Sequence, residues 1–314
     1  MVISIFLLGS GVFRIQFIVT LVPIFSIFVI GYLIGKGTQL DVRSLSFVAV
    51  NVFYPFLAFH TFYENPLTYN HLYIFITFGA LILLLFLTIL VFSNLSSLHK
   101  QRTHAMLLAG LFMNGGNYGV PVVLFTFGQE GFVYALMVMV VMGMLMNSLG
   151  LYIAASGANE NISKKAAILK TIKMPLLPAT LAGMLFQIIG LELPEQVIET
   201  IELLSNAAIP LIMIVLGVQL STIVVRKIEW GYVGFIVFTR LVLSPLLTLI
   251  IVNIVGLNSS VLGDVLVLIA AMPSAANTTI FSVRFHVDPN FVSSATFIGT
   301  VLSIVTLPIW FAIL

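Results

Sequence analysis

Residues 113–121 of this 314-residue sequence read Met113-Asn-Gly-Gly-Asn-Tyr-Gly-Val-Pro121 and lie at the centre of a long apolar run. The stretch combines glycines, a proline and two amides, which a simple lipid-facing helix would not tolerate. Glycine and proline leave backbone groups that hydrocarbon cannot satisfy. The stretch therefore predicts a helix that is interrupted inside the protein.

A second stretch of this kind, Met272-Pro-Ser-Ala-Ala-Asn-Thr-Thr279, lies at the corresponding depth of another apolar run. Both predicted helices are thus interrupted near the bilayer midplane. In transporters with broken helices, the half-helix N-termini point their free N–H groups and positive dipole ends at the anionic part of a substrate. The two stretches therefore predict an anion-favouring site between them.

Candidate substrate-binding residues of this site supply neutral donors, neutral acceptors or exposed backbone. They are Asn114, Gly115, Gly116, Asn117, Tyr118, Pro121, Pro273, Ser274, Asn277 and Thr278. The alternative interpretation is that the glycines and prolines only kink the helices and allow close packing. Two interruptions matched in depth favour the binding site.

Two ionisable residues within predicted helices are candidates for coupling or gating. Arg240 lies well inside its helix, where an uncompensated charge is costly, so it should face protein or a water-filled cavity. It could instead cap carbonyls of a broken helix or snorkel to the interface. His60 could carry a proton between pH 5 and 8, or be a membrane-interface histidine without function.

Other polar and soft residues in the helices are interpreted as structural. We expect Asn147 and Gln187 to make hydrogen bonds between helices. A run of methionines is expected to provide packing or lipid-facing surface rather than a path for metal. It comprises Met137, Met139, Met142, Met144 and Met146.

The sequence offers little for catalysis. Cysteine is absent, which excludes disulfides, thiolate metal sites and a cysteine nucleophile. No carboxylate lies deep in a predicted helix, and no Ser-His-Asp spacing typical of hydrolases is present. The charge pattern also lacks the features typical of nucleic-acid-binding proteins. We therefore expect no enzyme, metal site, cofactor or nucleic-acid partner.

Composition places most of the chain in lipid. Hydrophobic residues make up 60% of it and charged residues 8%, with a mean hydropathy of +1.18. One soluble core cannot bury this much apolar surface. Since a bilayer span takes roughly 20 apolar residues, the sequence predicts an all-α integral membrane protein with ten transmembrane helices. They cover residues 16–35, 44–63, 71–93, 103–127, 130–156, 172–191, 201–224, 230–256, 261–285 and 290–314, and we expect residues 1–13 to extend the first helix.

The orientation follows from the positive charges in the loops. Odd-numbered loops carry Lys36, Arg43, Lys100, Arg102, Lys164, Lys165, Lys170, Lys173, Arg226 and Lys227, and Arg284 adjoins loop 9. Even-numbered loops carry no Lys or Arg. The odd loops should face the cytoplasm, so both termini of this multi-pass protein of the plasma membrane are expected outside the cell.

The longest polar break divides the chain into two groups of five helices. Because five is odd, the two groups must have opposite orientations, which is the condition for an inverted repeat. Asn51-Val-Phe-Tyr-Pro55 has the spacing of Asn206-Ala-Ala-Ile-Pro210 in the second group. We predict a first repeat over 1–156, a cytoplasmic linker over 157–173 and a second, inverted repeat over 174–314.

At these residues the sequence resembles the auxin efflux carrier family, which includes the plant PIN exporters and bacterial permeases for malonate or malate. The resemblance extends over all ten predicted helices. Its motifs are Ser46-Phe-Val-Ala-Val50 with Pro55-Phe-Leu-Ala-Phe-His60, Asn114 with Gly119-Val-Pro121, and Met272-Pro273 with Val287-Asp-Pro289. The short loop 5 suggests a prokaryotic transporter, a bacterial homologue of the plant PIN exporters.

The resemblance implies a fold like that of bile acid symporters. Helices 1, 2, 6 and 7 would form a scaffold, and helices 3–5 and 8–10 a moving transport domain in which the broken helices 4 and 9 cross. Transport would be elevator-like, in a homodimer. Asn114 matches the family asparagine associated with the substrate carboxylate. Thr278 replaces a proline of the plant members, so the substrate need not be auxin.

The leading functional hypothesis is a secondary transporter of small organic anions, carboxylates of malate, malonate or auxin type. The first alternative is a sodium-coupled symporter of the bile acid type. The second is a membrane sensor or channel that does not transport by alternating access.

Overall fold

The structure, a computed structural model, describes residues 10–38, 40–66, 68–158, 172–223 and 228–314. Most of the predicted linker, residues 159–171, lies outside the described residues, as do residues 1–9 of the N-terminal stretch. Lys164, Lys165, Lys170, Arg226 and Lys227, used above for orientation, also lie outside them. Within the described residues the N-terminal helix begins at Ser10.

The described chain is built from helices, and it contains no strand beyond one isolated bridge. The α-helices are α2 (Ser10–Gly37), α3 (Val42–Val48), α4 (Tyr54–Glu64), α5 (Asn70–Leu95), α6 (Lys100–Leu111), α7 (Val120–Leu145), α8 (Leu151–Gly157), α10 (Leu176–Ile189), α11 (Glu195–Ser221), α12 (Trp230–Phe238), α13 (Ser244–Ile254), α14 (Val261–Ala270), α15 (Ala276–Arg284) and α16 (Pro289–Ile313). Four short π-helical segments join some of them: η1 (Ala49–Phe53), η2 (Gly115–Gly119), η3 (Met146–Gly150) and η4 (Thr239–Leu243).

Among the described residues, six helical stretches are long and apolar enough to cross a membrane. They are Val42–Glu64, Asn70–Leu95, Gly115–Gly157, Glu195–Ser221, Trp230–Ile254 and Pro289–Ile313. The prediction of an all-α protein with several membrane-spanning helices is therefore confirmed. The stretch Gly115–Gly157 is divided by Gly128, whose φ of 64° is a left-handed conformation that glycine adopts without strain.

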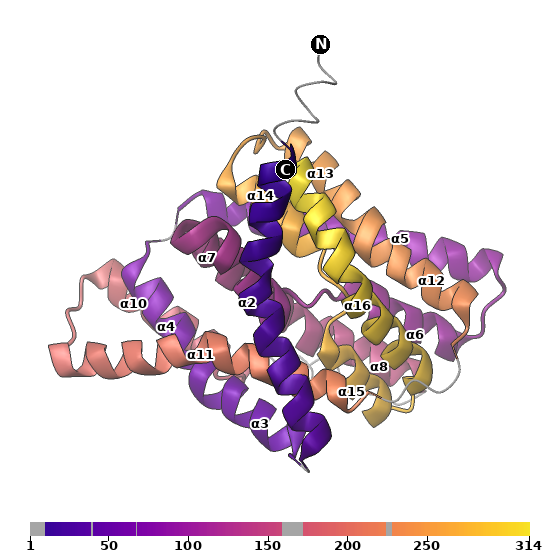
Figure 1. The fold of residues 1–314 in the computed structure, drawn as a ribbon, viewed down its shortest axis with the longest axis horizontal. Coiled ribbons are helices and arrows are strands. Elements are labelled where there is room, and N and C mark those ends of the chain that lie inside the picture. The colour runs from indigo at the N-terminus through magenta and orange to yellow at the C-terminus, as the bar shows by residue number, and fades with distance from the viewer. Residues whose placement is uncertain (1–9, 39, 67, 159–171, 224–227) are drawn as a thin grey trace.

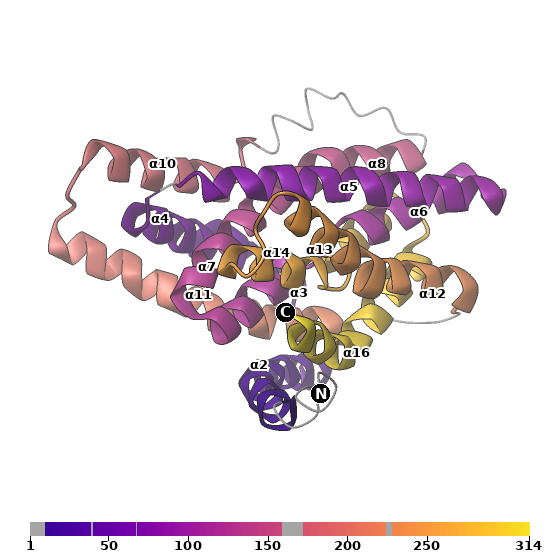
Figure 2. The same cartoon turned by 90° about the horizontal axis from the view of Figure 1, so that it is seen from above.

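The helices are grouped around the centre of the molecule. Figures 1 and 2 show α4, α10 and α11 together at one end and α6 and α12 at the other. Seen from above in Figure 2, α5 runs along one face and α2 lies at the opposite face. The buried core between them is mostly apolar, and it also contains buried polar side chains such as Asn114, Gln219 and Arg240.

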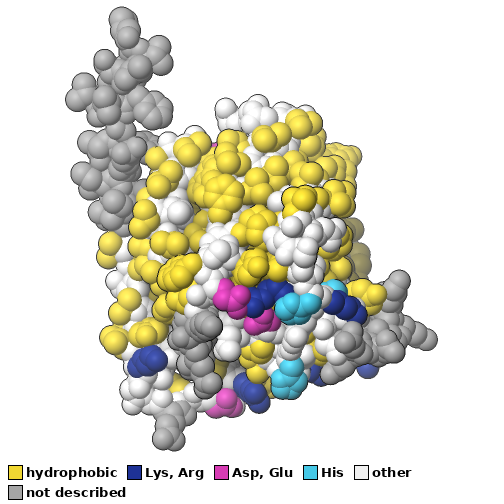
Figure 3. Space-filling model, turned by 90° about the vertical axis from the view of Figure 1, so that its right-hand side faces the viewer, with side chains coloured by type: hydrophobic (Ala, Val, Ile, Leu, Met, Phe, Trp, Pro, Cys, Tyr) yellow, Lys and Arg dark blue, Asp and Glu magenta, His cyan; other side chains and the backbone are white. Residues whose placement is uncertain are grey.

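One face of the molecule shows how its charges are distributed. In Figure 3 the charged and histidine side chains gather in a band near the lower end, while the surface above them is apolar. Arg102 binds Glu229 at 2.6 Å and Asp288 at 2.9 Å. Its guanidinium also stacks over the ring of Phe291 at 4.8 Å. These contacts join the chain segments that begin α6, α12 and α16.

Glycines bring two pairs of helices into backbone contact. In the pair α2 and α11, an added Cβ at Gly217 would lie 2.2 Å from the Phe28 carbonyl oxygen, and one at Gly31 would lie 2.4 Å from the Ile214 carbonyl oxygen. In the pair α4 and α10, a Cβ at Gly183 would lie 2.5 Å from the Phe59 carbonyl oxygen. Small residues drive this kind of packing in membranes. The four helices therefore form two tightly fitted pairs.

Replacing Gly217 with alanine should test this fit. The methyl group would overlap the backbone of α2, so we expect Gly217→Ala to lower the free energy of unfolding by about 1–3 kcal/mol. Thermal unfolding of the protein in detergent measures the change. Gly79→Ala is the control, because nothing lies within 4 Å of an added Cβ there. Equal melting temperatures for the two variants would contradict the packing argument.

Candidate functional site

Two helix interruptions that are far apart in the sequence pair with each other. The helix α6 ends at Leu111 before η2 begins at Gly115, and α14 ends at Ala270 before α15 begins at Ala276. Between these ends, the Asn114 N–H donates to the Pro273 carbonyl at 2.8 Å, and the Ala275 N–H donates to the Phe112 carbonyl at 2.8 Å. The two extended segments form an antiparallel bridge. They thereby satisfy backbone groups that hydrocarbon would leave unpaired.

Arg240 binds carbonyl groups at the C-terminal ends of α6 and α14, the helices that precede the two interruptions. Its guanidinium, on η4, donates to the Ala270 and Met272 carbonyls, each at 3.1 Å, and to the Gly110 carbonyl at 3.4 Å. The side chain is 1% exposed, and among the described residues it has no acidic partner. Cations are favourable at helix C-termini. The charge of Arg240 is therefore compensated by the negative ends of α6 and α14.

Two serines complete the capping of these C-terminal ends. The Ser244 hydroxyl donates to the Ala270 carbonyl at 2.8 Å, and the Ser274 hydroxyl donates to the Ala109 carbonyl at 2.6 Å. Both serines are buried. The acceptor groups at the interruptions are thus bound by protein donors.

The N-terminal ends of the helices that follow the interruptions lack side-chain caps. Neither Asn114, before η2, nor Ala275, before α15, caps its helix through a side chain. Both helix beginnings border a cavity of about 200 Å³. The cavity is lined by Val50, Tyr54, Phe112, Met113, Asn114, Gly116, Asn117, Met139, Met142, Gly143, Met146, Asn147, Met174, Leu176, Ala275, Ala276 and Asn277. Free N–H groups at two helix N-termini make this a favourable place for an anion.

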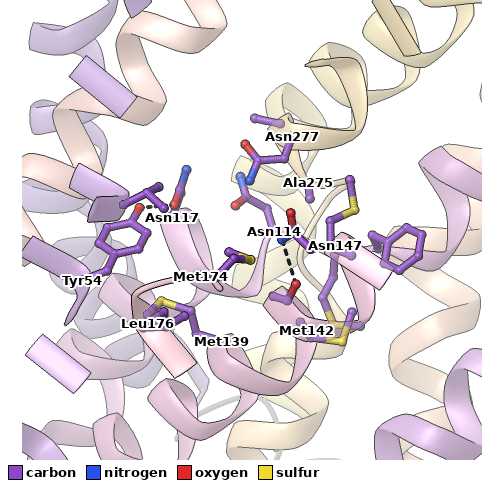
Figure 4. A pocket seen from close by; sticks show the side chains of 17 residues that line it. Tyr54, Asn114, Asn117, Met139, Met142, Asn147, Met174, Leu176, Ala275 and Asn277 are labelled. Atoms are coloured by element: carbon purple, nitrogen blue, oxygen red, sulfur yellow. Dashed lines mark hydrogen bonds between the residues drawn. The ribbon is translucent and has the colours of Figure 1, made fainter. Parts of the chain in front are cut away.

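The amides in the cavity supply further donors (Figure 4). Asn114 is 5% exposed, and its side-chain nitrogen Nδ2 has no hydrogen-bond partner in the described part of the chain. The oxygen Oδ1 of Asn117 accepts a hydrogen bond from the Tyr54 hydroxyl, so its nitrogen is the atom left for a ligand. A buried donor without a partner is unfavourable, and a bound carboxylate would supply the missing acceptor.

The other wall of the cavity is apolar and flexible. Met113, Met139, Met142, Met146 and Met174 contribute to it. Methionine side chains adapt to irregular shapes. The cavity therefore has a donor-rich part and an adaptable apolar part, and its lining among the described residues contains no charged side chain.

The sequence-predicted site residues divide into two groups. Asn114, Gly116, Asn117 and Asn277 line the cavity, whereas the other six do not. Gly115, Pro121, Pro273, Ser274 and Thr278 are buried. Of these, Pro273 and Ser274 hold the interruptions together, and the Thr278 hydroxyl donates to the Ala275 carbonyl at 2.6 Å.

Tyr118 points away from the cavity although it follows Asn117 directly. Its ring packs edge-on against Phe28, with centroids 5.2 Å apart, and its hydroxyl is bonded to Ser303 at 2.9 Å. The side chain is fully buried. Tyr118 therefore joins η2 to α2 and α16, and a substrate in the cavity would not reach it.

The two candidate coupling residues lie elsewhere. His60 lines a separate cavity of about 620 Å³ that is also lined by Glu64, Glu130 and Glu202. Arg240 lines neither this cavity nor the one at the interruptions. Of the interpretations left open for Arg240, the observed contacts match the capping of broken-helix carbonyls.

Several residues of the cavity were not among the sequence-predicted ligands. Tyr54 and Asn147 line it, as do three methionines of the run interpreted as packing or lipid-facing surface. Asn147 donates to the Gly143 carbonyl of its own helix at 2.9 Å, which differs from the expected bond between helices. Residues of three π-helical segments, η1, η2 and η3, line the cavity, and such segments are frequent at functional sites.

Comparison with known proteins agrees with these features. A sequence model of the family described as "Membrane transport protein" matches residues 16–311. An "Uncharacterized transporter" of Methanothermobacter thermautotrophicus is 31% identical over 306 residues, which cover 94% of this chain and 97% of the relative. The "Uncharacterized transporter MJ1031" of Methanocaldococcus jannaschii is 27% identical, covering 71% and 72%. A "Putative malonate transporter" of Rhizobium meliloti is 28% identical over 132 residues, covering 42% and 41%.

Replacing Arg240 should destabilise the protein through the carbonyl groups left behind. Each buried acceptor that loses its partner costs about 1–3 kcal/mol, so we expect Arg240→Met to lower the melting temperature strongly. Arg284→Met is the control. Arg284 is exposed, and the contact it makes is with the ring of Phe285 and not with buried carbonyl groups. If Arg240→Met melted like the control, Arg240 would not be the residue that holds the interruptions.

Proposed function

The chain belongs to the membrane transport protein family, the auxin efflux carrier family that its motifs resemble, and we propose that it is a secondary carrier of small organic anions. Its substrates would be carboxylates of malate, malonate or auxin type. One observation carries the proposal: two uncapped helix N-termini and the unpartnered Asn114 amide converge on one cavity, while the opposite helix ends are capped by Arg240 and two serines. No reaction is proposed, and the protein is not an enzyme in this view.

A carboxylate would bind at the donor-rich part of the cavity. Asn114, Asn117 and the N–H groups near Gly116 and Ala276 would donate to its oxygens, and the methionines would contact the rest of the molecule. Because the donors are neutral, an empty site leaves no buried charge unpaired. The empty site therefore pays no penalty for an unpaired charge, and in the bound state its donors would replace hydrogen bonds that the carboxylate loses with its water.

The proposed architecture has ten transmembrane helices in two inverted repeats. We count α6 with η2 as part of the fourth span and α14 with α15 as the ninth, and we divide the helical stretch that follows η2 at Gly128. Counted in this way, the described helices follow the predicted order. The interruptions then occupy equivalent places in the two repeats. Their pairing supports a crossing of helices 4 and 9 near the midplane.

The packing supports a division into a scaffold and a transport domain. The scaffold would contain helices 1, 2, 6 and 7, which correspond to α2, α3 with α4, α10 and α11. These are the helices that glycines fit together. The transport domain would contain helices 3–5 and 8–10 and move as one body in an elevator-like cycle, with the scaffolds of two copies forming a homodimer.

Contacts among the charged residues support the proposed orientation. Arg102, Glu229 and Asp288 belong to predicted loops 3, 7 and 9, and Arg102 binds both acidic side chains. These odd-numbered loops are thus on one side of the molecule, as the inside-positive arrangement requires. In the plasma membrane this side would face the cytoplasm, and both termini would be extracellular.

Thermal stabilisation by carboxylates, compared between the parent and Asn114→Ala, tests the binding site. A ligand that binds the folded state raises its stability. We expect a carboxylate of a panel that contains malate, malonate and indole-3-acetate to stabilise the parent, and its affinity to fall at least about tenfold in the variant, because a charge-assisted hydrogen bond is lost.

Without ligand, Asn114→Ala should melt at the parent temperature or above it, since the variant removes a buried donor without a partner. Asn253→Ala, at an exposed asparagine outside the cavity, is the control. Full retention of the ligand effect in Asn114→Ala would move the substrate to another site.

Cross-linking tests the elevator motion. Because the sequence contains no cysteine, a thiol reagent would react only with the introduced cysteines. Phe28 on α2 and Tyr118 on η2 are in ring contact but belong to different proposed domains. We expect a short bifunctional thiol reagent to abolish carboxylate counterflow in liposomes that contain the double variant Phe28→Cys with Tyr118→Cys. The single variants treated in the same way should retain it. Undiminished counterflow in the cross-linked protein would rule out relative motion of these segments.

A further inference from the structure

Asn147 presents a hydrogen-bond acceptor to the cavity. One of its two amide N–H groups donates to the Gly143 carbonyl at 2.9 Å, and its oxygen Oδ1 is the acceptor that the side chain offers. No partner for this oxygen is found among the described residues. Figure 4 shows the oxygen on the side of Asn114, away from the bond to Gly143.

The neighbouring polar groups of the cavity are donors. Asn114 offers an unpartnered Nδ2, and Asn117 offers its nitrogen because Tyr54 occupies its oxygen. A carboxylate satisfies these donors but has no hydrogen to give to Asn147. Two facing acceptors without a hydrogen between them repel each other, and a desolvated acceptor without a donor is unfavourable.

We propose that Asn147 determines specificity by accepting a hydrogen bond from an N–H or O–H group of the substrate, apart from its carboxylate. The inference rests on the proposed function and narrows its substrate class to organic anions that carry such a donor. A site that hydrogen-bonds a particular group discriminates strongly against an analogue that lacks it, because the protein group is then left unpaired.

The bond from Asn147 to its own helix does not by itself require a place in the cavity. Asn51 makes the same bond to the Phe47 carbonyl at 2.8 Å and also lies in a π-helical segment, but it does not line the cavity. Asn51→Leu is therefore a matched control for Asn147→Leu. Asn147→Ser is a second variant, since a serine hydroxyl can keep the local bond, as Ser148 does with the Met144 carbonyl at 2.7 Å, while it withdraws the acceptor from the cavity.

The experiment compares ligands in which the donor is either free or blocked by a methyl group. Affinities of the purified protein are measured for indole-3-acetate against 1-methylindole-3-acetate, and for malate against methoxysuccinate. We expect the parent and Asn51→Leu to prefer the donor-bearing member of at least one pair about tenfold. In Asn147→Leu and Asn147→Ser this preference should fall to within about twofold, chiefly through weaker binding of the donor-bearing member.

Each other outcome overturns the inference in a recognisable way. Equal binding of both members by the parent, or an equal loss of affinity for both in the Asn147 variants, would show that Asn147 has a structural role only. If no carboxylate, methylated or not, bound the parent, the proposed function itself would fail and this inference with it. Binding of the methylated members therefore separates the two failures.

Discussion

Two backbone hydrogen bonds, from Asn114 to the Pro273 carbonyl and from Ala275 to the Phe112 carbonyl, hold the interrupted helices together. Inside a membrane every backbone polar group needs a partner in the protein, and an interrupted helix has several without one. Here the two interruptions supply partners for each other. Neither would be stable alone, so the arrangement of the helices that carry them depends on this pairing.

The pairing leaves an uneven distribution of hydrogen-bonding groups. Carbonyls at the ends of α6 and α14 are bound by Arg240, Ser244 and Ser274, whereas the beginnings of η2 and α15 have no side-chain caps. A buried cation thus stabilises the acceptor side, and the donor side is left to the cavity. The proposed preference of the site for anions follows from this asymmetry and needs no charged residue in the cavity wall.

The interruptions could be predicted from the sequence because glycine, proline and asparagine inside an apolar run conflict with an unbroken lipid-facing helix. The position of Arg240 inside a helix indicated that its charge must be compensated. The sequence could not identify the carbonyl partners, since they lie 30 to 130 residues away. Tyr54 and Asn147 could not be assigned to the cavity, because their local sequence resembles other packed helices. Tyr118 was included with Asn117, although successive residues of a helical turn point in different directions.

Differences in packing within the molecule bear on how such a site could move. The glycine contacts of α2 with α11 and of α4 with α10 place backbone against backbone, and sliding these helices would create clashes. The contacts of η2 with α2 and α4 are made by side chains: Tyr118 with Phe28, and Asn117 with Tyr54. Side chains can exchange partners through rotamer changes, which backbone contacts cannot. Asn117 also lines the cavity, and its oxygen accepts a hydrogen bond from Tyr54. A ligand that accepted from its nitrogen would therefore bind the same side chain as Tyr54, and binding would be linked to the position of η2.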